Sequence, residues 1–137
     1  MSFEVLEHTA DVRVRVFGRD FRELLKNAAL ALMSLITDRE SVRLEEEVIF
    51  KTEAETSEEL LIKMLSEILY LHETEKMVFA DADMELNDGF NLSVRLRGEK
   101  TDLSRHELLY DIKAATYHNL KIERADDRFM AEIIFDI

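Results

Sequence analysis

The spacing of apolar residues changes along this chain, and that change limits the folds it can adopt. Two stretches carry apolar residues at the three- and four-residue spacing of amphipathic helices, whereas from Ala80 onward apolar and polar residues alternate as in half-buried strands. The predicted order is strand, helix, strand, helix and then four strands, which is not the regular alternation of βαβ units. We therefore predict an α+β fold with two layers, in which two main helices pack on one mixed or antiparallel sheet.

Both predicted helices begin at a capping signal. Asp20 is followed three residues later by Glu23, and Thr56 is followed three residues later by Glu59, which is the spacing of a capping box. Behind each cap the apolar residues form one stripe that should face the core. The stripes comprise Phe21, Leu24, Leu25, Ala28, Leu32 and Leu35 in the first helix, and Leu60, Leu61, Met64, Leu65, Ile68 and Leu71 in the second.

The remaining segments are predicted as strands. Val12, Val14 and Val16 alternate with arginines, and Gly18 ends this run. Asp88-Gly89 is a strong signal for a tight hairpin turn between two alternating arms. The other predicted strands are Val42 to Thr52, with Val48 and Phe50 facing inward, and a second hairpin after a short helical turn or loop near 104–109. Its arms are expected at about 116–123 and 128–135, with the turn at Asp126-Asp127.

Composition predicts one domain, residues 1–137, in a reducing compartment. The sequence has no repeat and no Gly/Ser/Pro-rich linker, and its length suits a single core. The absence of cysteine excludes disulfides, thiolate nucleophiles and thiolate metal sites. The N-terminus lacks the pattern of a signal peptide, and no apolar run approaches the roughly 20 residues of a membrane span. We expect a cytoplasmic protein.

The net charge of −12, from 30 acidic and 18 basic residues, narrows the choice of partners. A free-standing nucleic-acid binder normally carries a basic footprint, because much of its affinity comes from neutralising phosphates. An acidic body is better suited to a basic protein or to hard cations. A local basic patch is compatible with the sequence, since Arg13, Arg15, Arg19 and Arg22 lie close together along the chain.

Several familiar motifs are incomplete. His106-Glu107 begins like the HExxH motif of zinc proteases, but Tyr110 stands where the second histidine is required, so His106 is predicted to be a capping or surface histidine. With only three glycines, neither a phosphate-binding loop nor a dinucleotide fingerprint can be formed. No nucleophile elbow is present.

Two segments and the C-terminus carry the densest ionisable chemistry. Glu7-His8-Thr9-Ala10-Asp11 precedes the first predicted strand, and Tyr110 to Leu120 contains Lys113, Tyr117 and His118. At the end of the sequence, Asp136 stands beside the α-carboxylate of Ile137. If Asp11 came alongside, these three anionic groups would repel one another unless a cation or a lysine neutralised them. Hard divalent cations favour such oxygen ligands. The alternative from spacing alone is that Asp11 caps a turn and Asp136 lies free in solvent.

The sequence resembles the archease family along nearly its full length. The segments that carry the resemblance are His8-Thr9-Ala10-Asp11-Val12, the helix from Leu60-Leu61-Ile62 to Leu69-Tyr70-Leu71, the block from Tyr110 to Leu120, and the closing Ile133-Ile134-Phe135-Asp136-Ile137. Arg13 is a departure, because archeases usually carry a small residue such as glycine at this position.

The resemblance implies an accessory protein rather than an enzyme. Archeases are understood to activate the RNA-splicing ligase that joins 2′,3′-cyclic-phosphate or 3′-phosphate RNA ends to 5′-hydroxyl ends, notably in tRNA splicing. They promote guanylylation of a ligase histidine, allow multiple turnover and broaden the choice of nucleotide triphosphate. The implied partner is this ligase, with RNA reached only through it and with no DNA or membrane.

By position, the resemblance also implies a divalent-metal site. Asp11, Asp136 and the carboxylate of Ile137 would bind the metal, expected to be Ca²⁺, with Mg²⁺ and Mn²⁺ as alternatives. Lys113 would be a nearby cation, and His8, Tyr117 and His118 would be supporting residues. Outside that role, Lys113 would form an ordinary ion pair across the sheet, His118 would be an edge histidine, and Tyr117 would serve in packing.

The implied mechanism is that the acidic end docks at the active site of the ligase and helps to position its metal ions, since phosphoryl-transfer sites depend mainly on positioning and charge neutralisation. Two other functions remain open. A small metal-dependent hydrolase would use the carboxylates to activate water and would turn over alone. A chaperone-like acidic interaction module would be insensitive to chelators and to substitution of Asp11.

Overall fold

The computed structural model describes residues 2–7 and 11–137. Within these residues the elements follow one another as β1 (Phe3–Glu7), β2 (Asp11–Gly18), α1 (Phe21–Ile36), a 3₁₀ turn η1 (Arg39–Ser41), β3 (Glu46–Glu53), α2 (Ser57–Thr74), β4 (Met77–Asn87), β5 (Asn91–Lys100), β6 (Ala114–Thr116), β7 (Ile122–Ala125) and β8 (Arg128–Asp136). His8, predicted as a supporting site residue, lies outside the described residues.

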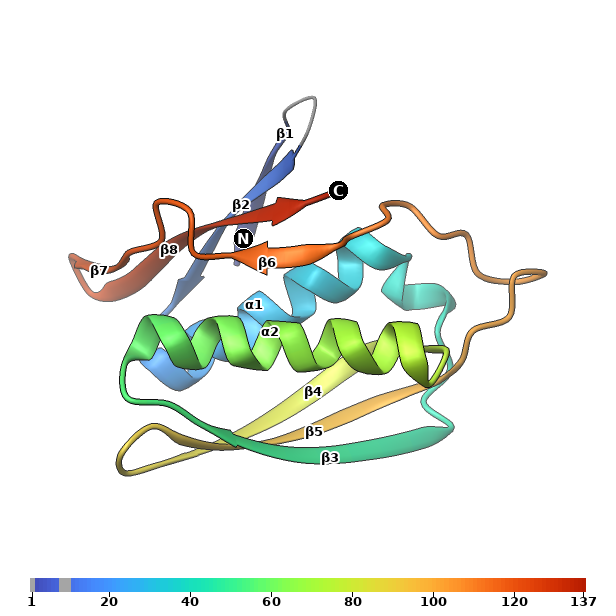
Figure 1. Cartoon of the computed structure of the whole chain (residues 1–137), viewed down its shortest axis with the longest axis horizontal. Helices are drawn as coiled ribbons and strands as arrows, with labels where there is room; N and C mark the ends of the chain where they lie inside the picture. Colours follow the sequence, from blue (N-terminus) through green and yellow to red (C-terminus); the bar gives the residue numbers. More distant parts are fainter. Residues whose placement is uncertain (1, 8–10) are drawn as a thin grey trace.

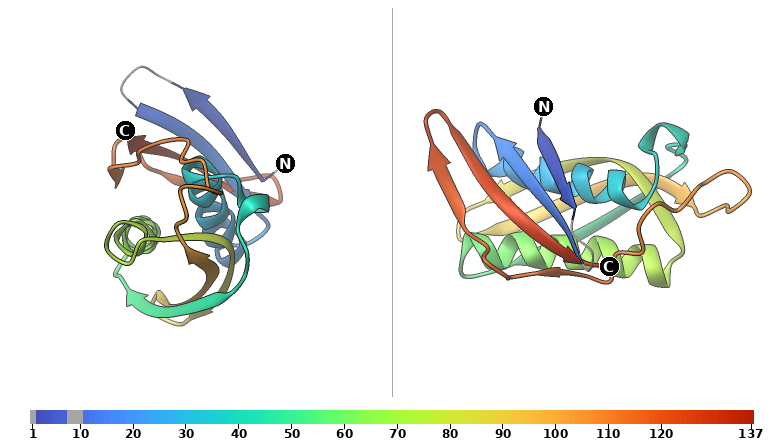
Figure 2. Two further views of the ribbon diagram at one scale, coloured as in Figure 1. Left: turned by 90° about the vertical axis from the view of Figure 1, so that its right-hand side faces the viewer. Right: turned by 90° about the horizontal axis from the view of Figure 1, so that it is seen from above.

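The described strands form two antiparallel sheets. One has the order β1-β2-β8-β6, with β7 also pairing with β8, and the other has the order β3-β5-β4. Both helices lie between the sheets (Figure 1). The left view in Figure 2, seen end-on, shows the same layers. Helix α1 contacts β2 of one sheet and β4 of the other, and α2 contacts β6 and β3, so the helices join the two sheets through one core.

Side chains along the strands alternate between the face that packs on the helices and the outer face of each sheet. In β2 the residues Val12, Val14 and Val16 are fully buried, while the intervening side chains, Arg13 and Arg15, are partly exposed on the outer face. Strand β8 adds Phe135, whose side chain is also fully buried. Each sheet therefore turns an apolar face to the helices and a polar face outward.

Both capping predictions are confirmed. The Asp20 carboxylate accepts a hydrogen bond from the Glu23 backbone N–H at 2.8 Å, and the Thr56 hydroxyl accepts one from the Glu59 backbone N–H at 3.1 Å. Every apolar residue predicted for the two stripes is buried except Phe21, which is partly buried and packs edge-on against Phe90, 5.8 Å between ring centroids.

The α+β class with two helices packed on antiparallel strands is confirmed, and the strand arrangement differs in detail. The strands form two sheets rather than one, so the helices are covered on two sides. Strand β1 was not predicted, because its pairing with β2 is not visible as a local pattern. Strand β3 begins at Glu46 rather than at Val42, and residues 42–45 connect it to the 3₁₀ turn.

The predicted second hairpin is also more complex than expected. Its turn at Asp126-Asp127 is confirmed by the pairing of Ala125 with Arg128, and Asp126 adopts a positive φ of 57°. The first arm is divided into β6 and β7, both paired with β8. A turn separates them, in which Asn119 has φ 53° and the Leu120 N–H bonds to the Tyr117 carbonyl at 3.0 Å.

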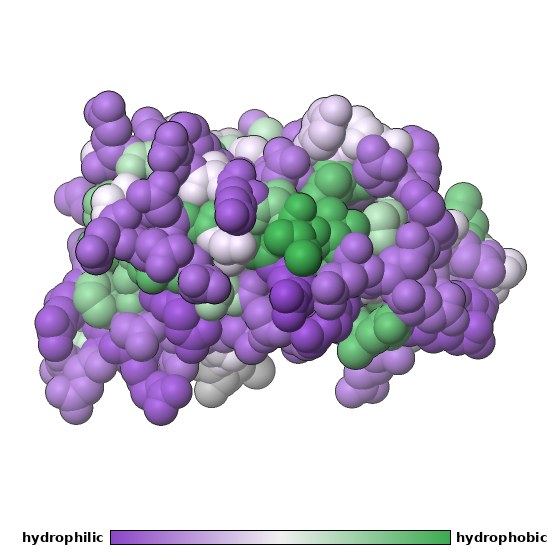
Figure 3. Space-filling view, turned by 90° about the horizontal axis from the view of Figure 1, so that it is seen from below, coloured by the Kyte–Doolittle hydropathy of each residue, from purple (hydrophilic) through white to green (hydrophobic). Residues whose placement is uncertain are grey.

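No helix in the part of the chain that the structure describes is long and apolar enough to cross a membrane. The face of the three-stranded sheet seen in Figure 3 is mostly hydrophilic, with a small apolar patch near its centre.

Candidate functional site

Asp11 and Asp136 are direct partners across two neighbouring strands. Asp11 is the first residue of β2, Asp136 is the last residue of β8, and the register pairs them. Directly opposed residues of an antiparallel pair turn their side chains to the same face, with Cβ atoms about 5 Å apart. The pairing of β2 with β8 therefore brings together two carboxylates that are 125 positions apart in sequence, at one end of the five-stranded sheet.

The surroundings of Asp11 leave one of its oxygens without a hydrogen bond. Asp11 Oδ1 is enclosed by protein atoms and has no hydrogen-bond partner in the described part of the chain. Its nearest cation is the Arg13 guanidinium, with Nε at 3.8 Å, and Arg13 Nε is itself enclosed without a hydrogen bond. A buried acceptor without a partner is costly.

Arg13 is the first member of an ion-pair ladder on the outer face of the sheet. Its Nη1 lies 3.8 Å from the Glu132 carboxylate, which also contacts Arg15 Nε at 3.4 Å. Arg15 in turn lies 3.6 Å from Glu4 on β1. The ladder alternates in sign across three strands, and each of its pairs is partly exposed, so we expect it to contribute little to stability.

The backbone around Asp136 is held on both sides. Besides its pairing with Asp11, Asp136 pairs with Ala114 of β6, and its carbonyl accepts a hydrogen bond from the Lys113 N–H at 2.8 Å. Ile137 packs its partly buried side chain against the core.

These oxygen groups suit a hard divalent cation but would leave its coordination incomplete. Within residues 2–7 and 11–137, no group of three or more His, Asp or Glu side chains is arranged to hold a metal. Two aspartates and one α-carboxylate would fill only part of the shell of a Ca²⁺ ion, which takes about 6–8 oxygens. Waters or groups from a partner would have to supply the rest.

The structure separates the predicted supporting residues into two groups. The Lys113 backbone is bonded to Asp136, and its side chain is exposed. Tyr117 and His118 lie beyond the far end of β6, about 10 Å along the strand from the level of Asp136. Tyr117 instead lines a hollow of about 570 Å³ between β3 and α2, together with Phe50 and Tyr70.

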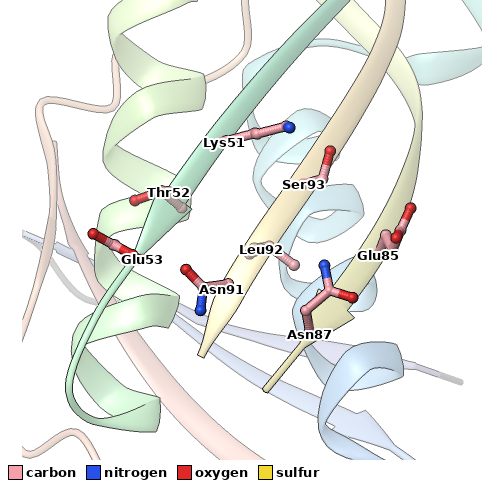
Figure 4. Close-up of a pocket in the computed structure, with 8 residues that line it drawn as sticks. All are labelled: Lys51, Thr52, Glu53, Glu85, Asn87, Asn91, Leu92 and Ser93. Carbon is pink, nitrogen blue, oxygen red and sulfur yellow. The ribbon is translucent and has the colours of Figure 1, made fainter. Parts of the chain in front are cut away.

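A second hollow, of about 530 Å³, lies on the outer face of the three-stranded sheet (Figure 4). Its hydrogen-bonding side chains come from β3, β4 and β5, and they include Lys51, Asn87 and Asn91. Its two carboxylates, Glu53 and Glu85, point away from each other (Figure 4). This hollow therefore lacks the converging pair of carboxylates that would activate water.

Of the two roles predicted for His106, the surface role is wrong because the residue is buried, whereas the capping role is confirmed by its bond to a backbone N–H. Its Nδ1 accepts the Asp102 backbone N–H at 2.9 Å, so the ring proton lies on Nε2, which donates to Glu99 at 3.0 Å. Burial raises the pKa of the Glu99 carboxyl, but bonds from the Arg43 N–H, the Arg105 guanidinium and His106 outweigh burial and lower it overall. The cluster fixes the loop after β5.

Glu132 and Glu99 are the charged residues of structural importance that sequence reasoning missed. The pairing of Glu132 with Arg15 depends on the register of β2 against β8. Glu99 is in phase with the outward-facing Arg95 and Arg97 of β5, so the alternating pattern predicts an exposed residue and no local signal marks its burial.

Comparison with known proteins identifies the family. Residues 3–137 match the model of the Archease protein family. The chain belongs to the archease family. It is 41% identical to a protein archease of Methanopyrus kandleri over 140 residues, covering 100% of both chains, and 40% identical to one of Pyrococcus furiosus, covering 99% of each.

A solved structure agrees with this membership. The chain superposes on the solution structure of Methanobacterium thermoautotrophicum protein 1598 with a TM-score of 0.82, at 30% identity and with 99% of each chain covered. Membership of the archease family supports, in general terms, the accessory role that the sequence resemblance implied.

Proposed function

We propose that the chain is a cytoplasmic accessory protein that activates an RNA-splicing ligase through a divalent cation held at its acidic end. The cation would be bound by Asp11, Asp136 and the α-carboxylate of Ile137. The observation that carries this proposal is the direct pairing of Asp11 with Asp136. Membership of the archease family supports the ligase as the partner.

The incomplete ligand set suggests how the activator and the ligase would cooperate. A cation with only three carboxylate groups from this chain keeps open positions, which a ligand from the ligase or its nucleotide can fill. When bound, such a cation supplies positive charge near the transferring phosphoryl group. The chain's own contribution would be to hold the two aspartates on rigid paired strands, so that the bound cation is kept at a fixed position.

The proposed consequence for the ligase is faster guanylylation of its histidine, repeated turnover and use of a wider set of nucleotide triphosphates. Lys113, exposed beside Asp136, would contact the anionic surface around the docked site. RNA would be joined by the ligase and not by this chain.

A multiple-turnover ligation assay tests the proposal. The ligase joins a 3′-phosphate RNA to a 5′-hydroxyl RNA with and without this chain, and with its Asp11→Asn and Asp136→Asn variants. Asp83→Asn is the matched control, because Asp83 is an exposed carboxylate on the other sheet. We expect stimulation to be lost in the two site variants and retained in the control.

The same assay distinguishes the two other functions. Stimulation that survives both site substitutions would support a chaperone-like acidic interaction module instead. Stimulation that a chelator leaves unchanged, while the concentration of the metal that the ligase needs is held constant, would support it too. RNA or nucleotide hydrolysis by the purified chain alone would support a metal-dependent hydrolase.

A further inference from the structure

The arginines that cluster along the sequence divide into two groups in the structure. Arg13 and Arg15 belong to the ion-pair ladder on the outer face of the five-stranded sheet. Arg19 and Arg22 lie at the opposite end of β2, where they border a shallow hollow of about 610 Å³. Two further basic residues from other elements, Lys26 and Arg128, line the same hollow. Its full lining is Ser2, Phe17, Gly18, Arg19, Arg22, Glu23, Lys26, Asn27 and Arg128.

The side chains of this basic hollow are held in place by specific contacts. The Arg128 guanidinium stacks over the Phe17 ring, 4.2 Å from its centroid. Arg19 makes two bonds to the Glu23 carboxylate, at 2.9 and 3.0 Å. Asn27 Nδ2 donates to the Phe17 carbonyl at 2.7 Å. A ligand would therefore meet partly ordered donors, which lowers the entropy cost of binding.

Positive charge exceeds negative charge within the hollow. Glu23 is the one carboxylate among its lining residues, and it is bonded to Arg19. Lys26 lies 3.9 Å from Asp83, while the nearby Asp20 carboxylate is bonded to the Glu23 N–H at the start of α1. Among the residues that the structure describes, Arg22 and Arg128 form no ion pair, so two exposed guanidinium groups remain available.

We propose that this basic hollow binds phosphate groups of an RNA strand. The planar guanidinium group of arginine can donate two parallel hydrogen bonds to phosphate oxygens. Two guanidinium groups without ion pairs, on the border of an open hollow, suit a chain of phosphodiesters better than one small anion. The excess of positive charge is local in a protein of net charge −12. Binding by the chain alone is therefore weak, limited to a few phosphates and steeply dependent on salt.

The position of the hollow is consistent with the proposed function, on which this inference rests. The hollow lies at the Gly18 end of β2 and Asp11 at the other end, roughly 23 Å away along the strand. With the acidic end docked at the ligase active site, the hollow would lie outside that site, within reach of an RNA strand that extends from it. The chain would thereby contact the RNA directly, in addition to acting through the ligase.

Fluorescence anisotropy of a labelled single-stranded RNA, titrated with the full chain in the absence of ligase, tests this inference. Arg22→Glu and Arg128→Glu should each weaken binding about tenfold, the equivalent of one charge-assisted hydrogen bond. Each should also lower the salt slope by roughly 0.7 for every phosphate that the variant no longer binds. Arg22→Lys and Arg128→Lys should bind more tightly than the glutamate variants and more weakly than the natural chain, because they keep the charge and lose the paired donors of the guanidinium group, which separates charge loss from misfolding.

Arg43→Glu is the matched control, because it changes the net charge equally. Arg43 is exposed and lies beyond the far end of α1, a helix about 24 Å long. Equal weakening in this control would overturn the inference, since only the overall field would then matter. Unchanged binding in both site variants would overturn it too. GTP or inorganic phosphate binding that the site variants abolish, with RNA binding unaffected, would overturn the assignment to RNA.

A second comparison separates this inference from the proposed function. Asp11→Asn should leave RNA binding intact, because Asp11 lies at the other end of β2. Failure of the ligase assay with intact RNA binding would count against the metal site alone. Loss of RNA binding in Asp11→Asn would overturn the inference that the hollow is the RNA site.

Discussion

Arg13 is the residue that most directly affects the candidate cation site. Its guanidinium lies 3.8 Å from Asp11 Oδ1, yet neither Arg13 Nε nor that oxygen has a hydrogen-bond partner in the described structure. The arginine therefore supplies positive charge at the site without satisfying the acceptor. A divalent cation approaching Asp11 must overcome repulsion from this guanidinium, which at such distances is a sizeable energy near a protein surface.

Replacing Arg13 by Ala should accordingly strengthen divalent-cation binding. We expect the affinity for Mn²⁺ or Ca²⁺, measured by isothermal titration calorimetry on the purified chain, to rise roughly tenfold because one nearby positive charge is removed. Arg15→Ala is the control, since Arg15 contacts Glu132 and Glu4 and not Asp11. An affinity that is unchanged in Arg13→Ala, or that falls, would show that Arg13 does not oppose the cation.

Glu99 is a buried charge whose contribution to stability depends on pH. Its side chain is only 5% exposed, and its lowered pKa means that the folded state favours the ionised carboxylate. A carboxyl group with a depressed folded pKa stabilises the protein above its unfolded pKa, and this contribution disappears as the pH falls through the folded value.

Glu99→Ala should therefore lower the free energy of unfolding by roughly 3 kcal/mol near neutral pH, because it leaves Arg105 and His106 without their partner. Urea denaturation from pH 7 down to pH 3 measures the effect, and the difference from the natural chain should shrink toward the acidic end. Glu107→Ala, at an exposed neighbouring side chain, should be nearly neutral. A difference that grows on acidification would contradict the assignment of a charged Glu99.

At the scale of elements, the features predicted correctly are those that depend on residues only a few positions apart in the sequence. The capping residues Asp20 and Thr56 fix the starts of both helices through bonds to residues three positions away, so a short window of sequence contains the whole signal. The Asp88-Gly89 turn is equally local, and Gly89 adopts the positive φ of 74° that favours glycine.

Pairings between distant strands could not be read in the same way. The division into two sheets and the pairing of β1 with β2 depend on which apolar faces meet, and period-two alternation does not choose between partners. The same limit applies to the candidate site. The ionisable side chains of Asp11 and Asp136 raise the possibility of a shared site and the family resemblance assigns them to it, but the enclosed Asp11 Oδ1 and its contact with Arg13 required coordinates.

The close approach of β5 to β4 gives a prediction at this scale. A Cβ placed on Gly98 would lie 2.0 Å from the Val78 carbonyl oxygen and 2.7 Å from the Phe79 Cα, next to the irregularity in the register of β4. The backbone atoms of β4 can move aside only at a large cost in free energy. Gly98→Ala should therefore destabilise the protein by about 2 kcal/mol or more. Thermal unfolding measures this, with Ser93→Ala on the same strand as control. Equal stability of the two variants would contradict the close packing.

At the scale of the whole molecule, the fold places acidic and basic groups in different regions of a protein whose net charge is −12. The five-stranded sheet carries the paired aspartates at one end of β2 and the basic hollow at the other, with the ion-pair ladder between them. The C-terminus lies beside the start of β2, where β8 ends (Figure 1). This arrangement places the proposed cation site and the basic hollow at opposite ends of β2.

The account depends most on whether that acidic end drives the first step of the ligase. Labelling of the ligase histidine with radioactive GTP, in a single turnover, measures this step without RNA. The account predicts that the chain accelerates labelling and that Asp11→Asn and Asp136→Asn, folded normally by circular dichroism, do not. Equal acceleration by the natural chain and both variants would contradict it.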